Sequence, residues 1–161
     1  MIARYAWMAV FLLLVIIAAS IASSFEAGEW YFTMNKPGWT PPAWLFGPVW
    51  SVLYVLMALA MWLVWVSQHY TRVGALIWWL IQLSLNAAWS WLFFGLNRTG
   101  WALAEMLLLI GIAILCTRAF SLSSRLAAML MLPYVLWLMF AWVLNFAIWM
   151  MNGGGLGITL D

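Results

Sequence analysis

The chain is organised around one stretch, Lys36-Pro-Gly-Trp-Thr-Pro-Pro-Ala-Trp-Leu-Phe-Gly-Pro-Val-Trp50. Most of the prolines of the chain fall in it, together with three tryptophans. Each proline fixes φ at about −65° and removes a backbone donor, and the residue before it is disfavoured in the α region. The segment from Lys36 to Pro42 is therefore predicted to be a stiff, non-helical ramp. It leads into a helix for which Thr40 is the expected N-cap, with Pro41 or Pro42 in the first turn.

Composition places the chain in a membrane. Apolar residues make up 69% of the 161 residues and charged residues 6%, which is more apolar surface than a soluble domain of this size can bury. The single cysteine, Cys116, and the single histidine, His69, exclude an internal disulfide and a multi-cysteine or paired-histidine metal site. No phosphate-binding glycine loop and no basic cluster is present, so no nucleic-acid partner is expected. Neither a metal site nor a required cofactor is expected.

Five continuous apolar runs are long enough to span a bilayer, which takes about 20 residues of helix. A β-barrel would instead show alternating segments of about 10 residues. We therefore predict a single all-α domain over residues 1–161, a bundle of five transmembrane helices. The first run is long enough to favour an uncleaved helix over a signal peptide, and Gly153 to Gly155 predict a helix stop and a flexible tail. The expected spans lie near residues 6–24, 44–66, 76–96, 101–120 and 126–151.

The connections between these runs differ in length. Asn97–Gly100 and Ser121–Arg125 are short, so the helices that they join are expected to be antiparallel neighbours. The first connection, residues 25–42, is much longer and rich in aromatic side chains. Long loops in compact folds are usually functional or binding loops, so we expect this connection to pack back over the bundle.

Basic residues are distributed unequally between the two ends of the expected bundle. By the positive-inside rule, the end with more of them is cytoplasmic. The N-terminus is therefore predicted to be cytoplasmic, if the protein lies in a bacterial inner membrane. The opposite end, which carries the long first connection, is called the loop end below. Arg4, Arg72, Arg118 and Arg125 fall at the N-terminal end, and Lys36 and Arg98 at the loop end.

Three of the expected helices carry a stripe in which aromatic residues mix with amides or methionines, at spacings of three and four residues that share a helix face. Most of these residues fall in the loop half of the bundle, beneath the aromatic first connection. A mostly apolar cavity with a few polar groups is typical of small-molecule sites, and tryptophan faces suit a flat, conjugated ligand. The stripes are Trp50, Tyr54, Met57 and Met61; Gln82, Asn86, Trp89, Ser90 and Phe93; and Tyr134, Trp137, Ala141, Asn145 and Ile148.

Each of these features also has a structural interpretation. Amides inside a bilayer can serve as hydrogen-bonded contacts between helices, which is the favoured interpretation for Gln82, whereas pocket lining is favoured for Asn86 and Asn145. The tryptophans of the ramp could form an aromatic belt at the membrane surface. Glu105 is expected to find an indole or backbone partner at the rim, and Cys116 is expected to pack as a small apolar residue.

Several motifs in order along the chain resemble those of the tryptophan-rich sensory protein/translocator protein family, also called the peripheral-type benzodiazepine receptor. The resemblance spans nearly the whole chain. The matching motifs are Lys36-Pro-x-Trp39-x-Pro41-Pro42, Gly47-Pro-Val-Trp50, Leu53-Tyr54, Gln82-Leu…Asn86…Trp89…Phe93-Phe94-Gly95, Gly100-Trp-Ala-Leu103 and Leu132-Pro-Tyr134…Trp137…Leu144-Asn145.

This resemblance implies a five-helix bundle, often a homodimer, with a ligand pocket closed by the first loop. It implies porphyrin ligands, including protoporphyrin IX and haem, and synthetic benzodiazepine-site ligands. Trp50 and Trp137 match tryptophans linked in bacterial relatives to light-dependent porphyrin breakdown, and they are the candidate catalytic residues. The cholesterol motif of animal members is incomplete here, because Phe146 stands where it needs tyrosine and no basic residue follows Arg125. By motif match, the ligand contacts are Tyr31, Trp50, Asn86, Trp137, Ala141 and Asn145.

Together these observations predict an integral membrane receptor or sensor that binds porphyrins or similar hydrophobic ligands. It would regulate tetrapyrrole levels or signalling, in contact with membrane lipid and as a homodimer. Two alternatives stay open, a porphyrin-degrading enzyme that needs light and oxygen, and a porphyrin or lipid transporter. The expected ligand-binding residues are Tyr31, Trp39, Trp50, Tyr54, Asn86, Trp89, Ser90, Trp137, Ala141 and Asn145.

Overall fold

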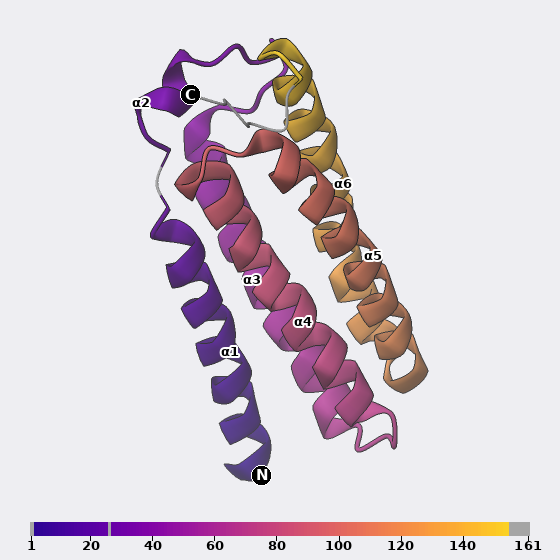
Figure 1. The fold of residues 1–161 in the computed structure, drawn as a ribbon. Coiled ribbons are helices and arrows are strands. Elements are labelled where there is room, and N and C mark those ends of the chain that lie inside the picture. Colours follow the sequence, from indigo (N-terminus) through magenta and orange to yellow (C-terminus); the bar gives the residue numbers. More distant parts are fainter. Residues whose placement is uncertain (1, 26, 155–161) are drawn as a thin grey trace.

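The computed structural model of the chain describes residues 2–25 and 27–154, which contain no β-strand. The expected all-α class is confirmed (Figure 1). Glu26 in the first connection and Gly155 in the expected tail lie outside the described residues. The helices are α1 (Ile2–Ser23), α2 (Glu29–Thr33), α3 (Ala43–Val66), α4 (Arg72–Ser90), the π-helical turn η1 (Trp91–Gly95), α5 (Thr99–Ser123) and α6 (Arg125–Met151).

Within residues 2–25 and 27–154, five helices are long and apolar enough to cross a membrane, namely α1, α3, α4 with η1, α5 and α6. Each begins a few residues before the corresponding apolar run. The reason is visible at Arg72, Thr99 and Arg125, which open α4, α5 and α6. A helix can start with a polar residue outside the hydrocarbon region, so hydropathy alone places its beginning too late.

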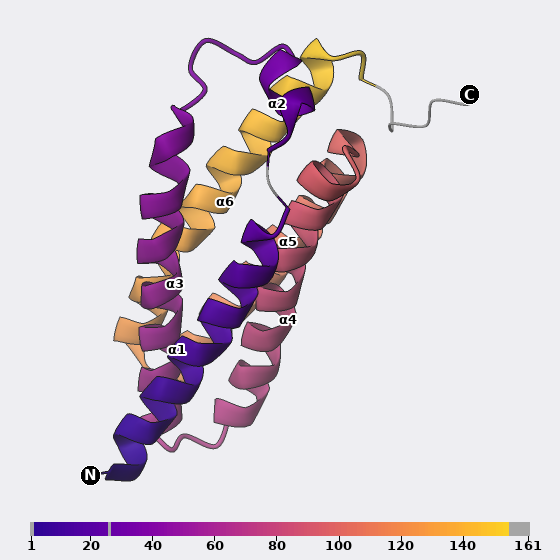
Figure 2. The ribbon, with the colours of Figure 1, turned by 90° about the vertical axis from the view of Figure 1, so that its left-hand side faces the viewer.

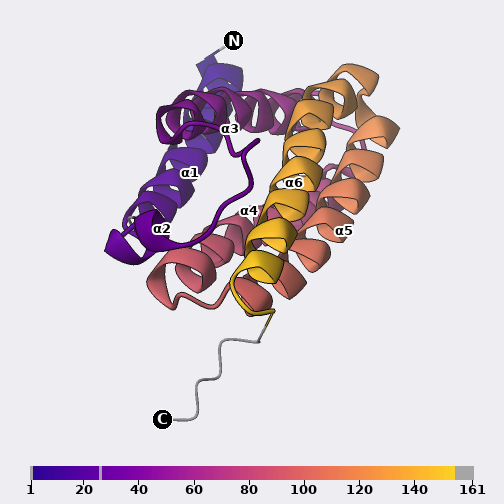
Figure 3. The same ribbon diagram turned by 90° about the horizontal axis from the view of Figure 1, so that it is seen from above.

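The spanning helices form a closed ring in the order α1, α3, α6, α5, α4 (Figure 3). The closest packing is between α5 and α6 and between α4 and α5. These are the pairs joined by the short connections, so the expectation that they are antiparallel neighbours is confirmed. The ring encloses a dense core in the half of the bundle away from the loop end.

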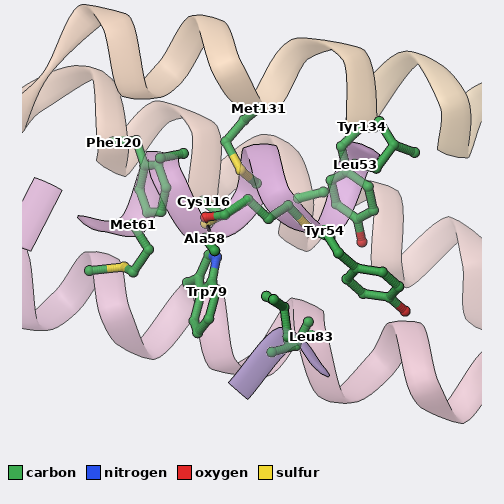
Figure 4. Packing of buried hydrophobic residues seen from close by; sticks show 14 of the residues in the cluster. Leu53, Tyr54, Ala58, Met61, Trp79, Leu83, Cys116, Phe120, Met131 and Tyr134 are labelled. Carbon is green, nitrogen blue, oxygen red and sulfur yellow. Dashed lines mark hydrogen bonds between the residues drawn. The ribbon is translucent and has the colours of Figure 1, made fainter. Parts of the chain in front are cut away.

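This core is built from large apolar side chains of several helices (Figure 4). Trp79 of α4 is fully buried, and its indole Nε1 donates to the carbonyl of Met57 in α3 at 3.2 Å. The side-chain amide of Gln82 donates to the sulfur of Met57 at 3.7 Å, in the half of the bundle away from the loop end. Gln82 therefore joins two helices, as expected. Cys116 is fully buried in the same cluster and packs as a small apolar residue.

The ramp is non-helical from Lys36 to Pro42, as predicted. The N-cap prediction is wrong, because Pro42, with φ −60° and ψ 142°, occupies that position and makes no side-chain cap. Thr40 is used elsewhere: its amide and its hydroxyl both donate to the carbonyl of Pro37, at 2.9 and 2.7 Å. The hydroxyl that could have capped α3 therefore closes a turn within the ramp.

The first connection packs back over the loop end, as expected, and it contains the short helix α2 that the sequence did not predict (Figures 1 and 2). Two tertiary features hold this segment, called the cap below and defined as residues 27–36. Trp30 and Tyr31 pack on Phe93, with ring centroids 5.7 and 6.3 Å apart. Asn152, directly after α6, accepts from the Asn35 amide at 3.0 Å and donates to the Asn35 carbonyl at 2.8 Å.

The last turn of the third spanning segment widens into the π-helical turn η1. Such turns are rare and occur frequently at functional sites. Gly95 closes the turn against Phe25 from the first connection, and an added Cβ would meet the Phe25 ring at 2.9 Å. A glycine is therefore needed where the chain leaving α1 crosses the end of η1.

Candidate functional site

A cavity of about 610 Å³ lies in the loop half of the bundle, beneath the cap. This volume is within the range of small-molecule sites, about 300–1,000 Å³. All five spanning segments contribute to its wall, and apolar and aromatic side chains dominate it. This arrangement follows from the stripes. α3 begins at the loop end, whereas α4 and α6 end there, so the aromatic and amide residues of the three helices lie at the same depth.

The structure brings the expected ligand residues together with one exception. The exception is Trp39, whose side chain is 50% exposed and packs on Phe140 at a centroid distance of 6.0 Å. The turn between Pro37 and Thr40 places the Trp39 ring away from the cavity wall. The expected residues that line the cavity are Tyr31, Trp50, Tyr54, Asn86, Trp89, Ser90, Trp137, Ala141 and Asn145.

The sequence did not predict the contribution of α1. This helix has no amide and no aromatic stripe in its second half, so nothing in its pattern signals a binding face. Its small residues, including Ala22, were a weak signal at most. Further residues of α3, η1, α5 and α6, most of them apolar, complete the wall. The lining residues missed or left unassigned are Ile16, Ala19, Ser20, Ala22, Ser23, Phe25, Ala27, Phe46, Gly47, Ser51, Phe93, Phe94, Met106, Leu144 and Ile148.

Asn86 is held in the wall by a hydrogen bond between two helices. The hydroxyl of Tyr54 in α3 donates to Oδ1 of Asn86 in α4 at 2.6 Å, and both side chains are buried. An amide has both acceptor and donor capacity, and Tyr54 uses the acceptor. This bond fixes the Asn86 amide at the cavity wall.

Asn145 makes a different contact, with the backbone of α5. When its amide is assigned so that both groups find partners, it donates to the Thr99 carbonyl and accepts from the Leu103 amide, each at 3.2 Å. The two backbone groups belong to adjacent turns of α5, so the side chain of Asn145 fastens α6 to the start of that helix. Asn145 therefore lines the cavity and also joins two helices.

Two indole donors at the cavity wall have no acceptor. The Nε1 atoms of Trp89 and Trp137 are buried without a hydrogen-bond partner in the part of the chain that the structure describes. Buried donors are nearly always paired. Both tryptophans line the cavity, but the two nitrogens themselves are covered by neighbouring side chains, so a ligand would meet the ring faces and edges and not these donors.

Trp50 of α3 and Trp137 of α6 line the same cavity, as their stripes predicted. Trp50 packs on Tyr54 and Tyr134, with centroids 5.6 and 6.3 Å apart. Trp137 packs on Phe46 at 5.9 Å. Aromatic neighbours fix both indoles, which suits recognition of a rigid planar molecule.

Tyr31 closes the cavity from the cap. Its ring packs on Phe94 at 5.6 Å, and the ammonium group of Lys36 lies 4.3 Å above the ring and donates to the Tyr31 carbonyl. Burial raises the pKa of the Tyr31 hydroxyl above its ordinary value, because desolvation disfavours the phenolate. The hydroxyl is therefore a neutral donor over the physiological pH range.

Two titratable residues lie apart from the cavity wall. His69, at the opposite end of the bundle, has its Nδ1 2.8 Å from the Thr71 hydroxyl. The expectation of an indole or backbone partner for Glu105 is wrong for the described residues, where both carboxyl oxygens are buried without a hydrogen bond. Backbone groups inside α5 are bonded within the helix, so none is free to donate to this carboxyl group.

Substitution tests whether the two asparagines contact a ligand or only join helices. Asn86→Ala removes a polar group of the cavity, so we expect the affinity for a ligand in the cavity to fall by about 1–2 kcal/mol, roughly tenfold. Asn86→Ala also removes the bond to Tyr54 that joins α3 and α4, and Asn145→Ala removes the contact between α5 and α6, so each variant should lower both the affinity and the melting temperature. Titration and thermal melts of both variants check this. Unchanged affinity with a lower melting temperature in both would mean that the amides only join helices.

Comparison with known proteins places the chain among membrane proteins of one family. Residues 7–150 match the model of the TspO/MBR family. The human translocator protein is 41% identical over 143 residues, covering 85% of each chain. The protein CrtK of Rhodobacter capsulatus is 36% identical over 146 residues, covering 89% of this chain and 91% of its own. The tryptophan-rich protein TspO of Archaeoglobus fulgidus is 36% identical over 144 residues, covering 87% and 94%.

Proposed function

The chain belongs to the TspO/MBR family, and from this premise we propose that it is an integral membrane receptor or sensor for porphyrins and similar flat hydrophobic molecules. The ligand binds in the cavity beneath the cap. Its binding regulates tetrapyrrole levels or signalling.

One observation carries this proposal: an apolar cavity of about 610 Å³ is walled by several tryptophans, and aromatic neighbours hold Trp50 and Trp137 in place. A porphyrin is rigid and planar, so it loses little conformational entropy on binding, and its faces can stack on indoles.

The charge of the cavity wall suggests how a porphyrin would lie. The lining residues carry no charge in the described part of the chain, and an unpaired carboxylate is costly to bury. We therefore expect the two propionates of protoporphyrin IX to point out of the apolar cavity. At the loop end, the ammonium group of Lys36 lies 4.3 Å from the centre of the Tyr31 ring, so a cation lies next to a lining residue of the cavity.

An equilibrium titration tests the proposal. Purified protein in lipid nanodiscs is titrated with protoporphyrin IX, haem and cholesterol, and binding is followed by quenching of tryptophan fluorescence. We expect saturable quenching at one site per chain with both tetrapyrroles and much weaker binding of the sterol. Quenching that rises linearly with every additive would show partition into lipid and would refute a porphyrin site.

A second candidate function is favoured by the placement of Trp50 and Trp137 in one cavity. Indoles are easily oxidised, and an illuminated porphyrin held beside them in the presence of oxygen could be converted to an open-chain product. Illumination of the complex, followed by absorption spectroscopy and mass spectrometry, separates the two functions. A bilin-like product that the Trp50→Phe and Trp137→Phe variants fail to form would favour the enzyme.

The assembly and orientation of the protein are also proposals. We propose that it acts as a homodimer in the membrane. Four arginines gather at the N-terminal end of the bundle, and the positive-inside rule makes this end cytoplasmic in a bacterial inner membrane. Cysteine accessibility at Tyr70, which is 88% exposed at that end, would test the orientation in intact cells.

A further inference from the structure

In the part of the chain that the structure describes, the exposed residues of the cavity wall lie on one side, between α1 and α3. Among its described lining residues, those on α4, α5, α6 and the cap are buried or half-buried. The exposed ones all belong to the two remaining helices. They are Ile16, Ser20 and Ser23 of α1 and Gly47 and Ser51 of α3.

The packing of α1 explains this opening. Its first half is fastened to the bundle: Trp62 of α3 donates to the Arg4 carbonyl at 2.9 Å, and Phe11 packs edge-on against Trp79 at 5.7 Å. Beyond Ala18, no described residue of α1 is buried. The two helices therefore meet near the N-terminal end and diverge toward the loop end (Figure 2).

Most residues at the edges of the opening have small side chains, and some of their hydroxyl groups are already hydrogen-bonded. Ser23 donates to the Ser20 carbonyl at 3.1 Å, and Ser51 donates to the Gly47 carbonyl at 2.9 Å. A serine bonded to its own helix can face lipid without an unpaired hydroxyl. The opening lies between two helices that are long and apolar enough to span a membrane, so a bilayer around the bundle would border it.

The cap, in contrast, closes the aqueous side. Tyr31 packs on Phe93 and Phe94, and the reciprocal bonds between Asn35 and Asn152 tie the cap to the end of α6. A molecule arriving from water would have to break these contacts, whereas one dissolved in the bilayer meets an open gap.

We infer that hydrophobic molecules enter and leave the cavity laterally, from the loop-side leaflet of the bilayer, through the gap between α1 and α3. The cap stays closed during this exchange. The identity of the molecule as a porphyrin rests on the proposed function, but the route does not. Ser20 and Ser51 are exposed lining residues on the two edges of this gap, one on each helix.

A cysteine placed inside the cavity tests the route without any porphyrin. In a Cys116→Ala background, Ala141→Cys provides a single thiol in the cavity wall, and a membrane-partitioning maleimide is added to protein in nanodiscs. Ser20→Phe and Ser51→Phe narrow the gap. Matched controls are Ile17→Phe and Val52→Phe, at neighbouring exposed positions that do not line the cavity. Asn152→Ala removes both bonds of the side chain to Asn35.

We expect the two serine variants together to slow labelling by about tenfold, because gating changes access rates. The controls and Asn152→Ala should leave the rate unchanged. Faster labelling in Asn152→Ala, with no effect of the serine variants, would make the cap the gate and overturn the inference. If phenylalanine at these positions prevents folding, Ser20→Leu and Ser51→Leu give the same comparison, with thermal melts reporting the fold.

Stopped-flow mixing with protoporphyrin IX extends the test to the proposed ligand. The serine variants should lower both the association rate and the dissociation rate of protoporphyrin IX, because a narrowed route raises the barrier in both directions. A wild-type protein that is labelled through the gap but binds no protoporphyrin IX would refute the proposed function and leave the route standing.

Discussion

Ala141→Phe is expected to weaken protoporphyrin IX binding by about 100-fold or more, equivalent to roughly 3 kcal/mol. Ala141 lies in the cavity wall on α6, between the levels of Trp137 and Asn145. A phenyl ring there would fill space that the ligand needs, and the packed helices around it cannot move apart without strain. An equilibrium titration in nanodiscs measures the effect.

The control for this variant is Ala147→Phe. Ala147 is a half-buried residue of the same helix that does not line the cavity. The larger side chain at this position is expected to leave the affinity unchanged, whatever its effect on stability. Thermal melts of both variants report whether the bundle is intact, and Ala141→Leu offers a smaller intrusion. Full affinity in a folded Ala141→Phe protein would show that the ligand binds elsewhere.

Replacing Trp50 and Trp137 together by alanine is expected to reduce porphyrin affinity by about 100-fold, since each removes a large aromatic face and its contact area. The corresponding phenylalanine variants keep an aromatic face, so each should weaken binding by only about 1 kcal/mol or less. This graded series separates stacking from simple loss of packing. The change is followed through the absorption of the bound porphyrin, which does not depend on the number of tryptophans left.

Trp62→Ala is the matched control. Trp62 binds the Arg4 carbonyl at the opposite end of the bundle, so its loss should lower stability and leave the cavity unaltered. An equal loss of affinity in Trp62→Ala and in the cavity variants would mean that the effect comes from destabilisation of the whole bundle. Unchanged affinity in the double alanine variant would show that these indoles are not ligand contacts.

The part of the site that the sequence predicted is the part set by helical periodicity and depth. Asn86, Trp89 and Ser90 share a face because they lie three and four residues apart on one helix. The opposite directions of α3 and α6 bring Trp50 and Asn145 to the same level. Polar groups inside a bilayer are confined to the bundle interior, so periodicity alone predicts which face they occupy.

The parts that the sequence could not predict depend on tertiary contacts of irregular segments. The side chain of Thr40 is of a type that caps helices. The fold of the ramp instead directs its hydroxyl to the Pro37 carbonyl, so it does not cap α3. That same turn places Trp39 against Phe140. The second half of α1 has no pattern that marks it as a cavity wall, because its role follows from its divergence from α3.

The central claim is that a porphyrin sits in the cavity beneath the cap, and an oxidation footprint tests it most directly. Illuminated protoporphyrin IX generates singlet oxygen, which oxidises the tryptophans nearest to it, and peptide mass spectrometry then ranks the tryptophans by oxidation rate. The account predicts that Trp50, Trp89 and Trp137 are oxidised first and that haem, which competes for the site, suppresses their oxidation. Oxidation that is as fast at Trp7 and Trp62, at the opposite end of the bundle, would contradict it.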